Sequence, residues 1–230
     1  MKNLTKKISM ATILAILIIG MVVGSTSCVS KEGQLPVLEI GNQWVYRLVV
    51  EVEDFEYNAT IEVTEEDVVD GTDYYVTEWS FEPAIEGVIS DWTIKVDKAT
   101  NFPLRLQIAG TTFGVPFTTM VEFSYNFPSG SWWPLEAGKE IKVRETSFET
   151  SRVGGKITEE REEIRTITYE VVGTEKITVT TGTFKCFRIV GYDEVGKKVS
   201  TSWYSDTVKN DVKHITHEED KVMELKSYSL

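Results

Sequence analysis

A long alternation of side-chain character runs from Phe113 to Phe127. Every second residue there, including Phe113, Phe117 and Phe123, is apolar or compatible with burial, and the residues between them are mostly small or polar. A period of two held over this length predicts one long β-strand with a buried face and a wetter face. Most strands have about five or six residues, so a strand this long is typical of a large, strongly curved sheet.

Most of the chain after the first 36 residues alternates in the same way. Trp44, Tyr46 and Leu48 form one side of an early segment, and Asp70-Gly71 between two such segments predicts a tight hairpin. These patterns predict an all-β fold, with a single antiparallel domain of about ten to thirteen strands over residues 37–230. We expect a curved sheet or an open or closed β-barrel, with a β-sandwich as the alternative.

The first 27 residues have the composition of a secretory signal peptide. Lys2, Lys6 and Lys7 precede an uncharged apolar run, and that run is short for a membrane span. Small residues lead from there to Cys28, an arrangement that resembles the lipobox of bacterial lipoproteins. The resemblance implies that the leader is removed, that Cys28 is lipidated, and that residues 28–36 form a polar tether. Cleavage without lipid and an uncleaved anchor are the alternatives.

The chain has two cysteines, Cys28 and Cys186. Cys186 lies in an apolar strand segment, where a small buried thiol is the expected role. A lipidated Cys28 then leaves the domain without a disulfide, so its core must hold it together. A single domain of about 200 residues can bury roughly 70% of its unfolded surface, which makes this feasible.

The net charge of −12 limits the partners that the chain can have. Loss of the lysine-bearing leader would make the chain more acidic still. Such a surface repels phosphate backbones and anionic lipid headgroups, so we expect no nucleic-acid binding. The membrane is expected as a partner through the acyl chains on Cys28, which would anchor the protein to the outer face of a membrane in the cell envelope.

Several short motifs resemble a loose group of exported bacterial proteins. They are Gly41-Asn42-Gln43-Trp44-Val45-Tyr46, Trp133-Pro134-Leu135-Glu136-Ala137-Gly138, Thr181-Gly182-Thr183-Phe184-Lys185-Cys186-Phe187-Arg188-Ile189, Trp203-Tyr204-Ser205 and Val212-Lys213. The group consists of uncharacterised lipoproteins with a curved, half-open β-barrel, similar in shape to the carriers of the lipoprotein-localisation system. The resemblance implies a fold and a compartment more than a function. Those carriers close the barrel with helices, and this sequence shows no helical plug.

The residue types needed for catalysis are few. The chain has two histidines, His214 and His217, and on a strand their spacing places them on opposite faces, at the exposed end of a hairpin. The sequence therefore predicts no metal site and no cofactor. It also lacks a Gly-x-Ser-x-Gly context, so we expect no catalytic residues and no enzyme activity. Two carboxylates of a hydrolase can meet from any part of a chain, and this alternative stays open.

Aromatic residues are the strongest candidates for contact with a ligand or partner. Trp132 and Trp133 lie in a segment rich in turn residues, where at most one is expected to turn inward and the other could be an exposed platform. The alternative is that this segment plugs one end of the barrel. Phe113, Phe117 and Phe123 are candidates to line a concave apolar face.

Together these features predict a membrane-anchored extracytoplasmic lipoprotein that acts as a non-catalytic binding or structural module. The sharper hypothesis is an apolar or lipid ligand on the concave face. The alternative is a protein-interaction or assembly module of the envelope. A hydrolase is the third candidate, and it would require convergent carboxylates with perturbed pKa in a cleft.

Overall fold

The computed structural model describes residues 32–50, 55–83 and 89–230, and all regular structure in this part is β-strand. The predicted signal peptide and Cys28 lie outside the described residues. The strands are β1 Glu32–Gly33, β2 Gln43–Val50, β3 Phe55–Val69, β4 Thr72–Glu82, β5 Ile89–Asp97, β6 Pro103–Thr112, β7 Val115–Asn126, β8 Leu135–Glu136, β9 Glu140–Val153, β10 Lys156–Val179, β11 Gly182–Tyr192, β12 Lys198–Ser205, β13 Asn210–Thr216 and β14 Lys221–Ser229.

Twelve of the described strands pair antiparallel around a closed barrel, in the order β10-β11-β12-β13-β14-β2-β3-β4-β5-β6-β7-β9. β1 and β8 form a separate two-stranded sheet. The prediction of an all-β antiparallel domain is confirmed. Hydrogen bonding closes the barrel, however, so the half-open form implied by the family resemblance is corrected. Among the described residues, no helix is long and apolar enough to cross a membrane.

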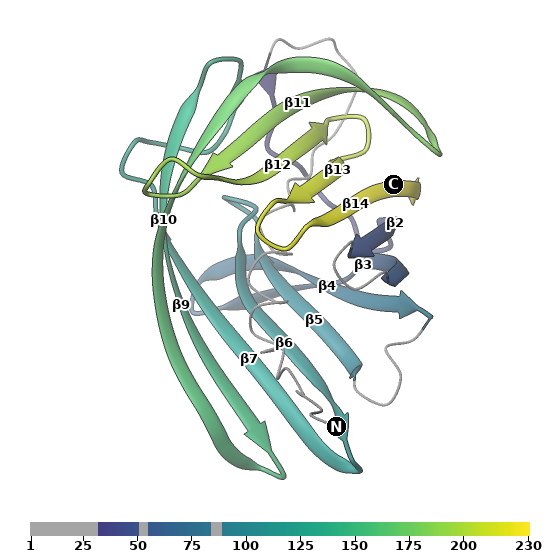
Figure 1. The fold of residues 1–230 in the computed structure, drawn as a ribbon, viewed down its shortest axis with the longest axis vertical. Coiled ribbons are helices and arrows are strands. Elements are labelled where there is room, and N and C mark those ends of the chain that lie inside the picture. Colours follow the sequence, from purple (N-terminus) through teal and green to yellow (C-terminus); the bar gives the residue numbers. More distant parts are fainter. Residues whose placement is uncertain (1–31, 51–54, 84–88) are drawn as a thin grey trace, which may run out of the picture.

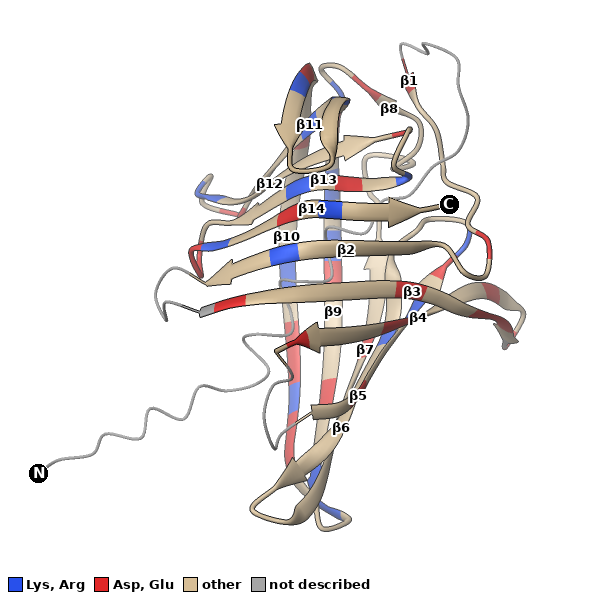
Figure 2. Cartoon of the chain, turned by 90° about the vertical axis from the view of Figure 1, so that its right-hand side faces the viewer, with Lys and Arg blue, Asp and Glu red and all other residues tan. Residues whose placement is uncertain are grey.

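The strands of the barrel run in two main directions. β9 and β10 curve along one side of the molecule (Figure 1), and β14, β2 and β3 cross in front of them at a steep angle (Figure 2). The hairpins β6–β7 and β9–β10 continue past the other strands at the lower end in both views. We call residues 113–121 together with 147–166 the arm.

The barrel closes through a short part of β10. β9 pairs with β10 from Lys156 to Glu170, and β11 pairs with β10 from Thr168 to Val179. The segment 168–170 is therefore the part of β10 that is paired on both sides. We call these three residues the seam.

A glycine makes room for the central residue of the seam. Tyr169 pairs with Ile141 on one side and with Gly191 on the other. A Cβ at position 191 would lie 2.6 Å from Oγ of Ser200 and 3.0 Å from Cε1 of Tyr169. The Tyr169 ring also meets Trp132 edge-on, with the ring centroids 5.1 Å apart. The seam thus depends on an aromatic ring that lies directly over a strand glycine, an arrangement that pins strand register.

Two hydrophobic clusters fill the barrel. The first lies along β2 to β7, extends to β11, β13 and β14, and contains Trp44, Ile61, Ile94, Leu106 and Val121 among other residues. The second packs the segment between β7 and β9 against β9, β10 and β11, and its members include Phe102, Trp132, Trp133, Tyr169 and Phe187. The side chains are buried in both clusters, so the described part of the chain has a core without any disulfide. Cys186 is a free, fully buried thiol within the first cluster, as the sequence predicted.

The long strand expected from Phe113 to Phe127 is two residues shorter at its start. Phe113 and Gly114 form the turn between β6 and β7, with φ angles of 50° and 77°. A two-residue hairpin with positive φ at both positions matches the twist of the flanking strands. The same geometry at Asp70-Gly71, with φ of 52° and 79°, confirms the hairpin predicted there.

Replacement of Gly191 tests the seam. G191A places a methyl group against Ser200 and Tyr169, and we expect it to lower the free energy of unfolding by about 1–3 kcal/mol. Urea unfolding followed by tryptophan fluorescence measures this change. S200A removes one of the two close contacts, so G191A/S200A should recover part of the loss. An unfolding midpoint of G191A equal to that of the wild type would contradict this account of the seam.

Candidate functional site

The inner face of the barrel is apolar on one side and charged on the other. Residues paired across strands share a face, so the pairing of β7, β9 and β10 defines four rows on the face that is buried at Glu145 and Glu149 and exposed at Glu159 and Arg161. They are Tyr125-Glu145-Arg165, Phe123-Ser147-Glu163, Val121-Glu149-Arg161 and Thr119-Ser151-Glu159. We call the eight β9 and β10 residues of these rows the polar wall. Acidic and basic residues alternate along β10 in Figure 2.

An ion pair lies at the inner end of the polar wall. Nη2 of Arg165 is 3.1 Å from Oε1 of Glu145, and Glu145 is 4% exposed. Burial raises the pKa of the Glu145 carboxyl, although the Arg165 guanidinium partly opposes this. Nε of Arg165 also lies 3.9 Å from Oε1 of Glu163. Arg165 therefore links a buried carboxylate to one nearer the solvent.

A second buried carboxylate, that of Glu149, lies two rows further along β9. Oε1 of Glu149 accepts a hydrogen bond of 3.3 Å from Oγ of Ser151, and the Ser151 hydroxyl in turn lies 2.9 Å from Oγ1 of Thr119. Burial is the main cause that raises the pKa of Glu149, and the nearby carboxylate of Glu159 adds to it. The wall thus contains two glutamates whose protonation is easier than in water, one beside an arginine and one held by hydroxyl groups.

The polar wall reaches solvent where β10 separates from β11. A cavity of about 220 Å³ lies at this point, and we call it the notch. β10 contributes Glu163 and Arg165, and the turns after β11 and β13 contribute Asp193 and Glu218. The remaining lining residues are Thr166, Ile167, Val199 and Ser200.

Local hydrogen bonds fix the turn residues of the notch. Oδ1 of Asp193 accepts the backbone N–H groups of Val195 and Lys197. Nζ of Lys197 lies 3.3 Å from Oε1 of Glu218. Three carboxylates and one guanidinium therefore border the notch, with hydroxyl groups beside them. The arrangement can receive hydrogen bonds from a small polar group, particularly a cationic one.

A serine, a histidine and an aspartate meet inside the barrel wall, but not as a catalytic triad. Nδ1 of His214 is 2.7 Å from Oγ of Ser202 and 3.4 Å from Oδ2 of Asp211. In a triad the serine and the acid contact different ring nitrogens, whereas both contact the same nitrogen here. Burial raises the pKa of the Asp211 carboxyl. Among the described residues, the Asp211 carboxylate oxygens and Nε2 of His214 have no hydrogen-bond partner, and the group lacks the geometry of a nucleophile with its base.

The two histidines do not share a site. His217 contacts Oγ1 of Thr201 at 2.9 Å, and His214 contacts the next residue of β12, so they approach opposite faces of that strand. The exposed position expected for His214 is wrong, because it pairs with Ser202 and is 5% exposed. In the part of the chain that the structure describes, no group of three or more His, Cys, Asp or Glu residues could hold a metal ion.

Both tryptophans of the candidate contact segment are buried. Trp132 is 5% exposed and Trp133 is 8% exposed. Nε1 of Trp133 donates to the carbonyl of Thr100 at 3.1 Å, and Nζ of Lys139 donates to the carbonyls of Trp132 and Pro134. The expectation that one ring forms an exposed platform is therefore wrong. The segment folds inward because lysine and backbone partners allow both rings to enter the second cluster.

The candidate phenylalanines do not lie together. Phe117 and Phe123 are each 7% exposed and belong to the first cluster. Phe113 lies in the hairpin turn at the tip of the arm and is fully exposed, so its expected place on the concave face is wrong. The apolar face predicted along this strand exists, but the core itself covers it.

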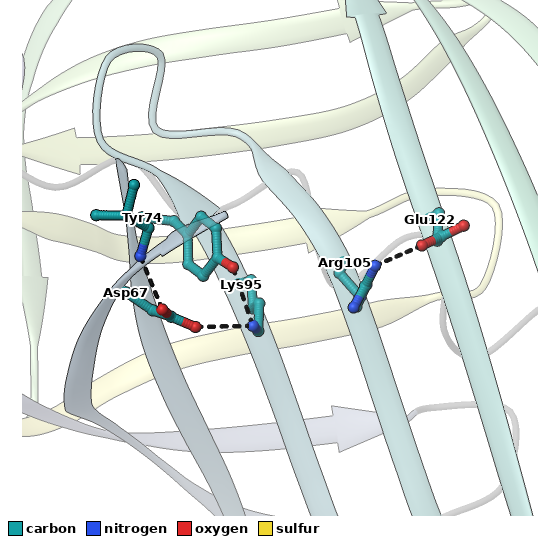
Figure 3. A network of polar contacts seen from close by, with 6 residues as sticks. Asp67, Tyr74, Lys95, Arg105 and Glu122 are labelled. Carbon is teal, nitrogen blue, oxygen red and sulfur yellow. Dashed lines mark hydrogen bonds and ion pairs between the residues drawn. The ribbon is translucent and has the colours of Figure 1, made fainter. Parts of the chain in front are cut away.

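Charged residues also link strands on the outer face, as Figure 3 shows. Nζ of Lys95 lies 3.2 Å from Oδ2 of Asp67 and 3.1 Å from the hydroxyl of Tyr74. Arg105 and Glu122 form a similar pair across β6 and β7 at 2.7 Å. Such exposed pairs add little to stability. They mark the solvated side of strands whose other side is core.

Sequence reasoning missed the polar wall. The alternation in β9 begins with Ile141 and Val143 facing inward, continues inward with Glu145 and Glu149, and leaves Phe148 exposed on the outer face. Apolar residues therefore change face along the strand. The available signal was the run of acidic and hydroxyl residues at every second position of residues 145–151.

Comparisons with known proteins give a limited result. A scan against protein-family models finds no match, and a search of curated proteins finds no similar sequence. One solved structure that aligns is a presumed exported protein with a YmcC-like fold from Bacteroides fragilis NCTC 9343. Its sequence identity is 10% and the TM-score is 0.37, and the alignment covers 92% of this chain and 100% of that chain. Another is a presumed lipoprotein from Parabacteroides distasonis ATCC 8503, at 12% identity and a TM-score of 0.37, covering 89% and 100%.

Neutralisation of Glu149 should stabilise the protein at neutral pH. Because the folded pKa of Glu149 is raised, its contribution to stability is present below the ordinary pKa of 4.5 and is lost as the pH rises through the raised value. E149Q cannot ionise, so it should unfold at a higher urea concentration than the wild type at neutral pH and at a similar concentration below pH 4.5. R165M is the contrasting change, because it leaves the buried Glu145 carboxyl without its counter-ion and should cost about 3 kcal/mol at neutral pH. A destabilised E149Q at neutral pH would show that its charge is favourable where it lies.

Proposed function

We propose that the protein is an exported, membrane-tethered, non-catalytic binding module whose ligand enters the barrel at the notch. One observation carries this proposal: the polar wall is buried at Glu145 and Glu149 and meets solvent where β10 leaves β11. Charged side chains are costly to bury. Glu145, whose pKa is raised, contacts Arg165 of the notch lining, and groups with perturbed pKa in such positions are typical of functional sites.

The charges of the notch favour a small cationic ligand. Glu163, Asp193 and Glu218 face one guanidinium, that of Arg165, and Arg165 already contacts Glu145. The excess of carboxylate oxygens suits an amine or guanidinium group. At about 220 Å³, the cavity is smaller than the roughly 300–1,000 Å³ of pockets for drug-sized ligands, so it suits a small molecule or one group of a larger one.

The packing of the core argues against an acyl chain on the concave face. Phe117, Val121 and Phe123 are all nearly buried in the first cluster. A lipid tail there would have to displace side chains that pack at crystal-like density. The apolar-ligand hypothesis is therefore less well supported than a polar ligand at the notch.

The proposal that the protein is not an enzyme rests on the geometry of Ser202, His214 and Asp211, the residue types of a catalytic triad. Ser202 and Asp211 both lie against Nδ1 of His214, and the ring is nearly buried. That arrangement does not present an activated hydroxyl to a substrate.

Attachment to the membrane is the second part of the proposal. Small residues before Cys28 support lipidation of this cysteine, and a tether over residues 28–36 would span at most roughly 30 Å. The domain would then lie close to the outer face of its membrane. The net charge of −12 leaves acyl chains rather than lipid headgroups as the means of attachment.

An interaction or assembly module is the second candidate function. The observation that favours it is the arm, which projects beyond the rest of the barrel in Figures 1 and 2 and ends in the exposed ring of Phe113. An apolar residue at such a tip is a feature of contact surfaces.

Titration with putrescine tests the notch. Ligand-observed NMR on the full chain in detergent should detect binding of putrescine and none of laurate. E163Q/E218Q removes two carboxylates and should weaken binding by about tenfold or more, since hydrogen bonds to charged groups contribute about 1.5–3 kcal/mol. E122Q is the control, because it removes a carboxylate on the outer face. Equal affinity in all three proteins, or binding of laurate alone, would overturn the proposed ligand class.

Substitution of the cysteines tests the anchor. In cells fed an alkynyl fatty acid, the wild-type chain should become labelled and sediment with membranes. C28S should lose the label, while C186A should keep it because Cys186 is buried in the core. Labelling of C28S at the wild-type level would exclude lipidation at Cys28.

A further inference from the structure

The arm carries several exposed apolar side chains. Phe117 and Val121 of the arm belong to the first cluster, but five of its large apolar residues are exposed: Phe113, Val115, Phe148, Ile157 and Ile164. Phe148 pairs with Glu162 across β9 and β10, and Ile164 lies two residues further along the same face. Grouped apolar residues on a projecting element are typical of a contact surface.

One edge of β10 within the arm has no described strand beside it. β9 pairs with the other edge from Lys156 onward, and β11 joins β10 at Thr168. The backbone N–H and C=O groups along one side of residues 156–167 are therefore available to a further strand. An unpaired edge of this length is a template for strand addition unless its side chains oppose it.

The side chains of this edge follow a self-complementary charge pattern. Glu159, Arg161, Glu163 and Arg165 alternate in sign on one face of β10. If a second copy of the strand lies antiparallel and the two copies pair at Glu162, Glu159 of each copy lies opposite Arg165 of the other. Arg161 of each copy then lies opposite Glu163 of the other. Centring the pair one residue away would oppose Arg161 to itself and Glu159 to Glu163. Centring it on Glu160 or Ile164 would keep one kind of opposite-charge pair instead of two, so the pattern favours Glu162 as the centre.

We propose that the free edge of β10 binds the same edge of a second copy of this chain, antiparallel and centred on Glu162. This inference concerns the second candidate function and requires no ligand in the notch, although the pairing would lie beside the notch and use Glu163 and Arg165 of its lining. The pairing would continue the sheet from one barrel into the next through a two-fold axis. It would also bring Ile164 and Phe148 of both copies to the same outer face.

Two features limit the strength of this association. The Glu162 side chains of the two copies lie opposite each other on the outer face, and the chain as a whole carries a charge of −12. Repulsion between distant charges is screened beyond about 8 Å at physiological ionic strength, whereas the paired charges on the edge are in contact. Arg161 already lies 3.0 Å from Glu163 in the same strand, and it can be shared with the second copy.

Cysteine cross-linking tests the register. In the full chain, E162C places two thiols opposite each other across the two-fold axis, at a separation that a disulfide can bridge. Mild oxidation should give a covalent dimer. E160C is the control, because it lies on the same exposed face but opposite Ile164 of the second copy. Equal cross-linking of E162C and E160C, or none of either, would overturn the proposed pairing.

Exchange of charges provides a second test that does not depend on a new cysteine. R161E and E163R each create like-charge pairs across the axis, and each should weaken self-association by about tenfold in analytical ultracentrifugation. A mixture of the two variants should associate as a heterodimer. The R161E chain is acidic at positions 161 and 163, and the E163R chain is basic at both. Each of these positions therefore faces an opposite charge in the heterodimer. An ion pair that acts only within one chain cannot be restored by mixing. Failure of the mixture to associate would overturn the proposal. R161E does not change a residue that lines the notch, so putrescine binding by the R161E chain keeps that result separate from the notch.

Discussion

The closure of the barrel depends on the backbone pairing of three residues in β10. Thr168, Tyr169 and Glu170 are bonded to β9 on one side and to β11 on the other, and the rest of β10 pairs on one side only among the described strands. The contact between the Tyr169 ring and Gly191 holds the register, because any side chain at 191 would occupy the space of the ring. A bulge between Val171 and Gly173 then shifts the pairing with β11 just beyond the seam.

The same constraint produces the features that we connect with function. Because β11 leaves β10 below Thr168, the inward charges of the polar wall reach solvent at the notch, and one edge of the arm stays free. The apolar half of the barrel supplies stability through the first cluster, while the polar half carries groups that are costly to bury. Glu145 and Arg165 meet this cost partly by pairing with each other. The difference between the apolar half and the polar half of the barrel follows from where β10 exchanges β9 for β11 as its pairing strand.

Much of the fold could be predicted from the sequence, because alternation and hairpin signals are local. The period of two anticipated the burial of Phe117 and Phe123, and the Asp70-Gly71 turn has the geometry expected of it. The sequence pattern placed Phe113 on the concave face of the strand, because the alternation of apolar residues continues into the turn that contains Phe113. The choice between an open and a closed barrel rests on pairing between residues far apart in the chain, such as Tyr169 with both Ile141 and Gly191, which no local pattern encodes.

The candidate site was harder to predict for a related reason. Sequence reasoning assigned function to exposed aromatic rings, but Trp132 and Trp133 fill the barrel instead. The polar wall uses acidic and hydroxyl residues at inward positions, which resemble an ordinary solvated face until the strand is placed in the barrel. Lipidation of Cys28 stays a prediction, because that residue lies outside the described part of the chain.

Amide hydrogen exchange along β10 decides whether the barrel closes at the seam. In dilute, monomeric protein, the seam predicts slow exchange at all three amides of residues 168–170. Along residues 159–167 every second amide points to the free edge, so fast and slow exchange should alternate there. Uniform protection from Glu159 to Glu170 would show that another segment covers the edge. Fast exchange at Tyr169 and its neighbours would show that the barrel is open, and the account of the seam, the notch and the free edge would fail together.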